Sequence, residues 1–185
     1  RAPRFVLLSC ISVSSFFGFA GTAFFAAFGS CFGTGAAAFA AFAGAVSASG
    51  VESGMECIRM IFPKLNMVPG ILIAPGWSEN AIVSAGLQAK TTRINGVFNC
   101  VCIVDIDSST NGATKYDDVK QQKEKQAVTS ANCYAVWLYA KVGDVLYAGS
   151  AMAAAVTVAT DADNGDIPNV SPSNKTVPIS AACLK

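Results

Sequence analysis

A short apolar stretch, Gly70-Ile71-Leu72-Ile73-Ala74, decides the class of fold, and the turn residues Pro75-Gly76 close it. Its β-branched residues and its lack of polar side chains are typical of a strand buried on both faces of a parallel sheet. A second such run covers residues 98–106. Between the two, Ser78-Glu79-Asn80 opens a segment to about residue 92 with apolar residues at helical spacing. This order predicts a strand-helix-strand unit.

The same pattern repeats further along the chain. Residues 116–130 predict a charged helix, and residues 134–139 predict a third strand. Residues 141–147 predict a turn or short hairpin, and an Ala-rich helix follows to about residue 159. Residues 51–61 predict a helix that Pro63 ends, whereas the polar residues 161–178 predict an exposed loop. The predicted fold class is therefore α/β, a three-layer fold with a mainly parallel sheet flanked by helices.

The first 50 residues have a different composition, which divides the chain into a low-complexity segment, residues 1–50, and an α/β domain, residues 51–185. The segment is rich in Phe, Ala and Gly, and its only charged residues are Arg1 and Arg4. Three interpretations stay open: a secretory signal, a pair of Gly- and Ala-rich membrane helices, or a sequence that is not native coding sequence.

Charge and composition exclude several classes of function. The chain has 185 residues, a net charge of +1 and no histidine. Without histidine, Ser-His-Asp, Cys-His and His-metal mechanisms are excluded on this chain. The near-zero charge gives no general attraction to nucleic acid. Seven cysteines are an odd number, so they cannot all pair within one chain. Cys100 and Cys102 are interpreted as small core residues and not as metal or redox ligands.

Residues that could carry chemistry are expected beyond the carboxyl ends of the predicted strands. These places are residues 75–80, 105–111 and 139–144. Asp105 and Asp107 could hold Mg²⁺ through oxygen ligands, and a small nucleotide- or Mg-binding α/β domain is the alternative function. The competing interpretation is that Asp107 and Ser108 cap the loop or the following helix.

Two serines near the predicted strand ends and helix starts are candidate nucleophiles. Ser78 and Ser150 would need a desolvated lysine such as Lys141 as their base, because the chain has no histidine. Residues 74–77 have neither the glycines nor the lysine of a phosphate-binding loop, and a turn is the expected role.

A series of segments resembles the central domain of contractile phage tail sheath proteins. The first segment is the run Ile61-Phe62-Pro63-Lys64-Leu65-Asn66-Met67-Val68-Pro69-Gly70-Ile71-Leu72-Ile73-Ala74-Pro75-Gly76-Trp77-Ser78. The others follow in the order of that family: a strand ending in Val104-Asp105, the run Ser130-Ala131-Asn132-Cys133-Tyr134-Ala135-Val136-Trp137-Leu138-Tyr139, an Ala-rich helix ending in Ala159-Thr160-Asp161, and Ser171-Pro172-Ser173-Asn174-Lys175. The resemblance covers about residues 50–178.

The resemblance implies a structural subunit of the contractile tail sheath of a phage or phage-like injection particle. Identical copies of such a subunit form helical rings around a tail tube and contract to drive the tube into the target. The implied fold is a subtilisin-like sheath core, and the implied partners are further copies of the chain, the tail tube protein and the baseplate. The implied location is the virion tail, after assembly in the host bacterial cytoplasm.

The resemblance also implies that the protein is not an enzyme and has no catalytic, cofactor-binding or metal-binding residues and no cofactor. Neither nucleic acid nor, for residues 51–185, a membrane is expected as a partner. The chain is expected to be a fragment, because residues 1–50 replace the N-terminal strands of the family and its C-terminal domain is not matched. The charges of residues 115–125 are expected either to form lattice contacts or to be an ordinary solvated helix face.

Overall fold

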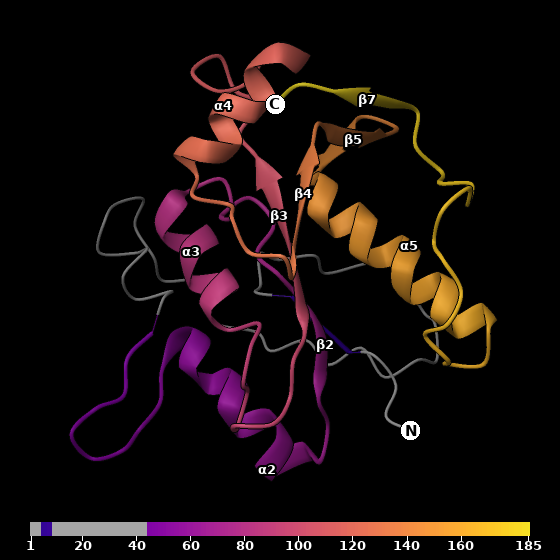
Figure 1. Ribbon diagram of the computed structural model, residues 1–185. Helices are drawn as coiled ribbons and strands as arrows, with labels where there is room; N and C mark the ends of the chain where they lie inside the picture. Colours follow the sequence, from indigo (N-terminus) through magenta and orange to yellow (C-terminus); the bar gives the residue numbers. More distant parts are fainter. Residues whose placement is uncertain (1–4, 9–43) are drawn as a thin grey trace.

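A parallel sheet with helices on both faces forms the centre of the fold (Figure 1). The computed structural model describes residues 5–8 and 44–185. The sheet has four strands, in the order β1 (Phe5–Leu8), β2 (Pro69–Ile73), β3 (Val101–Ile106) and β4 (Cys133–Trp137). All neighbouring strands in it are parallel. The mixed α/β class predicted from the sequence is confirmed.

Two sets of helices cover the two faces of this sheet. The helices η1 (Gly54–Met60, 3₁₀), α2 (Ile61–Leu65), α3 (Ala81–Ala89) and α4 (Tyr116–Lys125) lie on one side, and α5 (Gly149–Asp163) lies on the other (Figure 1). Alternate residues of each strand point to opposite faces. Leu72 and Val104 therefore enter one apolar cluster with Val83 and Leu87 of α3, while Ile71 and Ile103 enter the other with Ala154 of α5.

A small antiparallel sheet adjoins the end of β4. Its strands are β5 (Tyr139–Val142), β6 (Val145–Tyr147) and β7 (Ala181–Cys183), in the order β6-β5-β7. The pairing of β5 with β6 confirms the hairpin predicted for residues 141–147. Strand β7 was not predicted, and it brings the C-terminal residues back to the carboxyl end of the parallel sheet (Figure 1).

Pro63 does not end a helix, contrary to the prediction. The segment before it is the 3₁₀ helix η1, and Pro63 lies in the first turn of α2. A proline is tolerated there because the backbone N–H groups of a first turn have no partner within the helix. Asn66, with a left-handed φ of 52°, ends α2 instead.

The end of α5 also differs from the prediction. The helix continues to Asp163, so the irregular segment begins after it and covers residues 164–180. Asp161 was predicted to be in an exposed loop, but it is a buried residue in the last turn of α5.

The interpretations of residues 1–50 fall mainly outside the described residues. A strand was not predicted there, and the structure pairs β1 with β2 in parallel. Cys10 and Cys31 lie in the part that is not described. Within the described residues, no helix combines the length and the apolar character needed to cross a membrane.

Candidate functional site

Three segments that are far apart in the sequence meet around the carboxylate of Asp105. Asp105 lies near the carboxyl end of β3, Ser78 lies in the turn between β2 and α3, and Ser150 lies in the first turn of α5. The side chains are removed from water: Asp105 is 2% exposed and both serines are 0% exposed. A buried carboxylate is costly unless hydrogen bonds satisfy it, so the partners of Asp105 determine whether the site is stable.

Both oxygens of the Asp105 carboxylate accept hydrogen bonds from the serines. The Ser78 hydroxyl donates to Oδ2 at 3.0 Å, and the Ser150 hydroxyl donates to the same oxygen at 2.6 Å. The Ser150 backbone N–H donates to Oδ1 at 2.7 Å. Ser78 also accepts a hydrogen bond from the Asp105 backbone N–H at 2.9 Å. The result is a closed set of contacts that ties the sheet to helices on both of its faces.

The pKa of Asp105 is raised above its ordinary value. Burial is the main cause, because it penalises the charged form. The hydrogen bonds from Ser150 and Ser78 lower the pKa, and the charge of Glu79 raises it further. Desolvation therefore exceeds the stabilisation that the serine donors give.

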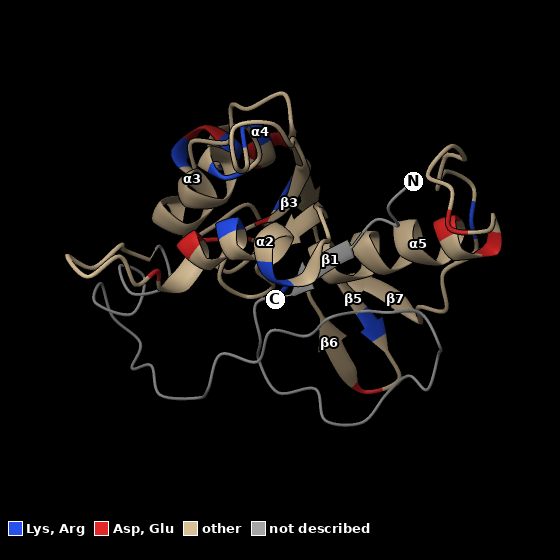
Figure 2. Cartoon of the chain, turned by 90° about the horizontal axis from the view of Figure 1, so that it is seen from below, with Lys and Arg blue, Asp and Glu red and all other residues tan. Residues whose placement is uncertain are grey.

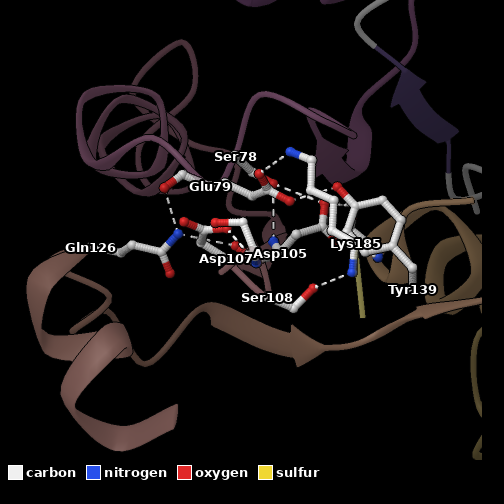
Figure 3. Close-up of polar contacts among 10 residues, drawn as sticks. Ser78, Glu79, Asp105, Asp107, Ser108, Gln126, Tyr139 and Lys185 are labelled. Carbon is white, nitrogen blue, oxygen red and sulfur yellow. Dashed lines mark hydrogen bonds and ion pairs between the residues drawn. The ribbon is translucent and has the colours of Figure 1, made fainter. Parts of the chain in front are cut away.

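A second, more exposed group of residues surrounds Glu79 at the same end of the sheet (Figure 3). The Tyr139 hydroxyl donates to Glu79 Oε1 at 2.5 Å, and Lys185 Nζ forms an ion pair with Glu79 Oε2 at 2.5 Å. The Lys185 backbone N–H donates to the Ser108 hydroxyl at 3.2 Å. These contacts attach the last residue of the chain to the loops that follow β2 and β3.

One further residue, Gln126, belongs to this cluster. Gln126 Nε2, at the end of α4, donates to the carbonyl oxygens of Glu79 and Asp105, the latter at 3.3 Å (Figure 3).

The pKa of the Tyr139 phenol is raised, first by burial and then by its hydrogen bond to Glu79. Tyr139 is therefore a neutral hydrogen-bond donor at physiological pH.

Asp107 has contacts of a different kind from those of Asp105. Its Oδ1 accepts the Ser109 backbone N–H at 2.9 Å, and its carbonyl oxygen accepts the Ala113 N–H at 2.8 Å. These local bonds fold the loop after β3, which is what the capping interpretation of Asp107 predicts. The Ser108 hydroxyl instead accepts the Lys185 backbone N–H, so its part in the capping interpretation stays a prediction.

The magnesium interpretation of Asp105 and Asp107 stays a prediction. Among the described residues, no group of three or more His, Cys, Asp or Glu side chains is placed to hold a metal ion. A melting temperature that rises with added MgCl₂ would support that interpretation, because a ligand that binds only the folded state stabilises it.

The nucleophile interpretation of the two serines receives no support from their contacts. Both hydroxyls donate to Asp105, and both residues are fully buried. Lys141, considered as a base, lies on β5 and pairs with Leu146 and Ala181.

Much of this site lies where the sequence predicts it, beyond the carboxyl ends of the strands. The predicted places include Asp105, Asp107 and the ranges that contain Ser78, Glu79 and Tyr139, and the structure brings these together (Figure 3). Gln126 and Lys185 were not predicted, because their participation depends on where α4 ends and on the return of the chain through β7.

No known protein family model matches the chain, and no curated protein matches it at a significant level.

Proposed function

We propose that the chain is a structural subunit of a contractile tail sheath, in which residues 51–185 form the subtilisin-like core domain. The observation that carries the proposal is that segments resembling the sheath family meet at Asp105. Ser78 closes the first resembling segment, Asp105 ends the resembling strand, and Ser150 lies at the start of the Ala-rich helix. Their polar atoms bond to one another, which is consistent with a packing role and with no chemistry.

The contacts around Asp105 suit a subunit that moves as a rigid body. In a contracting assembly, interfaces between subunits exchange contacts while each subunit keeps its fold. The buried hydrogen bonds of Asp105 connect β3 to the turn before α3 and to the first turn of α5, and each bond has two buried ends. Separating either serine from Asp105 would leave a buried carboxylate short of donors, so the elements on the two faces of the sheet are expected to move together.

Helix α4 is the proposed contact surface between copies. It carries acidic residues in its first turn and basic residues in its last turn, and these are exposed (Figure 2). None of its residues is buried. This distribution agrees with the helix dipole and offers charges of both signs to neighbouring copies. The tail tube protein and the baseplate are the other proposed partners, and the virion tail is the proposed location.

Sedimentation velocity of the full chain tests this proposal. We expect large assemblies to form as the protein concentration rises. We expect added salt to dissociate these assemblies, because salt screens exposed charges. The double variant K120E/K125E reverses two exposed charges of α4 and should lower the sedimentation coefficient at the same concentration. K175E, in the exposed segment after α5, is the matched control and should behave as the wild type.

Two outcomes would contradict the proposal. The first is a folded chain that stays monomeric at every concentration. The second is assembly that K175E also weakens, to about the same extent for each reversed charge as K120E/K125E, because general charge and not α4 would then control it.

A further inference from the structure

Two cysteines face each other across neighbouring strands of the parallel sheet. Cys102 of β3 and Cys133, the first residue of β4, are direct register partners. The Cys102 backbone N–H donates to the Asn132 carbonyl at 2.9 Å, which holds this register. Neighbouring strands lie about 4.8 Å apart, and a disulfide needs a Cα separation of roughly 4.4 to 6.8 Å. The backbone therefore already holds the two residues at bonding range.

The side chains of this pair are on the same face and in contact. Both belong to the apolar cluster beneath α3, in which Cys102 is buried and Cys133 is partly exposed. Both are free thiols, and a hydrogen-bond interaction between them shifts their pKa values in opposite directions. The Cys133 thiol also donates to the Tyr134 carbonyl oxygen at 3.9 Å. Among the described strands, β4 pairs with β3 alone in its sheet, so it can approach β3 without breaking a second ladder.

The two thiols differ in a way that assigns their roles. The hydrogen bond with Cys102 is the main cause that lowers the pKa of Cys133, and the charge of Lys123 adds to it, while burial opposes both. The same hydrogen bond is the main cause that raises the pKa of Cys102, and burial adds to it. Cys133 is thus the thiol that ionises first and that solvent reaches, as expected of an attacking thiol.

We propose that Cys102 and Cys133 are a redox-active pair, which a low-molecular-weight disulfide such as oxidised glutathione converts to an intrachain disulfide. The Cys133 thiolate attacks one sulfur of the reagent, forms a mixed disulfide and releases one thiolate. The Cys102 thiol then loses its proton and attacks the Cys133 sulfur, which releases the second thiolate. The two protein protons pass to the two released thiolates, so the protein pair is oxidised by two electrons and the reagent is reduced by two.

Formation of the mixed disulfide prepares the second step. It removes the Cys133 thiolate, and with it the interaction that most disfavours ionisation of Cys102. Cys100 is not expected to compete, because burial raises its pKa to about 12 and it lies before β3, outside the register of the pair. The link would tie β4 covalently to β3.

Peptide mapping of the oxidised full chain tests the proposal. The reduced protein is treated with oxidised glutathione at low protein concentration, alkylated and digested with trypsin without reduction. Trypsin separates the pair into residues 94–115 and residues 126–141. We expect a linked peptide with the summed mass of these two less two hydrogens, plus one alkyl group on the free Cys100, and we expect dithiothreitol to abolish it.

Variants distinguish Cys102 from Cys100, which lies on the same peptide. The link should persist in Cys100→Ala, the matched control, and disappear in Cys102→Ala. Any of three results would overturn the proposal: a wild-type chain that ends with glutathione on Cys133 alone, a link that survives in Cys102→Ala, or a Cys133 that links only to another cysteine or a second copy. Glutathione on Cys133 alone, and a Cys133 that links elsewhere, are both observed in the wild-type chain. These two results therefore stand even if a variant fails to fold.

Discussion

At the scale of single residues, Asp105 is the group whose replacement should cost the most. Three donors serve its carboxylate: the two serine hydroxyls and the Ser150 N–H. In Asp105→Ala these buried donors lose their acceptor, and each unsatisfied group costs roughly 1 to 3 kcal/mol. We expect a loss of about 3 kcal/mol in the free energy of unfolding, measured by urea denaturation of the full chain.

Asp107→Ala is the matched control for this substitution. Asp107 lies two residues away and is partly exposed, and its carboxylate accepts one backbone N–H. Its removal should cost about 1 kcal/mol. Equal losses in the two variants would contradict the structural role assigned to Asp105.

The raised pKa of Asp105 predicts a pH dependence of stability. A carboxyl with a higher pKa in the folded state than in the unfolded state binds its proton more tightly when folded. The contribution of Asp105 to the free energy of unfolding therefore increases as pH falls through the pKa of the folded state. This contribution stops changing below the ordinary pKa of 3.8. Above the folded pKa this contribution is lost.

The variant Asp105→Asn isolates this effect, because it has no proton to gain in that range. We expect the free energy of unfolding of the wild type, relative to that of Asp105→Asn, to increase as pH is lowered from neutral towards 4. A difference that stays constant with pH, or that shrinks on acidification, would mean that Asp105 has no raised pKa in the fold.

At the scale of elements, the start of α5 depends on a close approach that only glycine allows. A Cβ atom on Gly149 would lie 2.5 Å from the Leu138 carbonyl oxygen and 2.6 Å from Val136 Cγ1. The first atom is backbone in the connection between β4 and β5, and the second belongs to a side chain of β4 itself, so neither can move aside easily. We expect Gly149→Ala to lower the free energy of unfolding by about 2 kcal/mol.

Gly86→Ala in α3 is the control for that prediction. A Cβ there would meet the end of the flexible Met55 side chain, at 2.5 Å from its Cε. Alanine in a helix gains about 1 kcal/mol over glycine, which should offset the small rearrangement. We expect Gly86→Ala to be near neutral in the same urea assay, and an equal loss in both variants would exclude close packing at Gly149 as the cause.

The central elements were predictable because local and tertiary preferences agree in them. Residues 70–74 are apolar on both faces, and only a sheet covered on both sides satisfies that pattern. Helix α3 begins after Asn80, whose side chain accepts the Ile82 N–H at 2.9 Å, as the opening residues predicted. The Ala-rich run before Ala159 is likewise the helix α5.

The elements that were not predicted are those whose formation depends on contacts with residues far away in the sequence. Strands β1 and β7 are short, and each exists through pairing with one strand far away in the sequence. Periodicity over three or four residues carries too little information to predict such strands. The prediction that Pro63 ends a helix was wrong for a local reason, because a proline that stops one helix can equally lie in the first turn of another.

The candidate site was predictable in position and less so in its contacts. The rule that loops after parallel strands converge located Asp105, Ser78 and Tyr139. It did not indicate that Ser78 and Ser150 both serve Asp105, because that depends on how α5 packs against the sheet. A buried acid flanked by two buried serines has the composition of a catalytic group, but here both serine hydroxyls donate to the acid.

At the scale of the whole molecule, the two ends of the described chain are both tied to the central sheet. Strand β1 pairs with β2, and Lys185 contacts Glu79 and Ser108 at the carboxyl end of the strands. Helix α4 presents its charges outward, away from both apolar clusters (Figure 2). This arrangement agrees with a rigid subunit that acts through its outer surface.

Negative-stain electron microscopy of the concentrated full chain tests the proposed sheath role most directly. We expect tubes or stacked rings of uniform diameter whose Fourier transforms show layer lines, because identical subunits with a head-to-tail interface build helical assemblies. The assemblies of K120E/K125E should be fewer or absent under the same conditions, whereas those of K175E should be unchanged. The proposed sheath role would be contradicted by dispersed single particles from a chain that unfolds cooperatively in urea and is therefore folded.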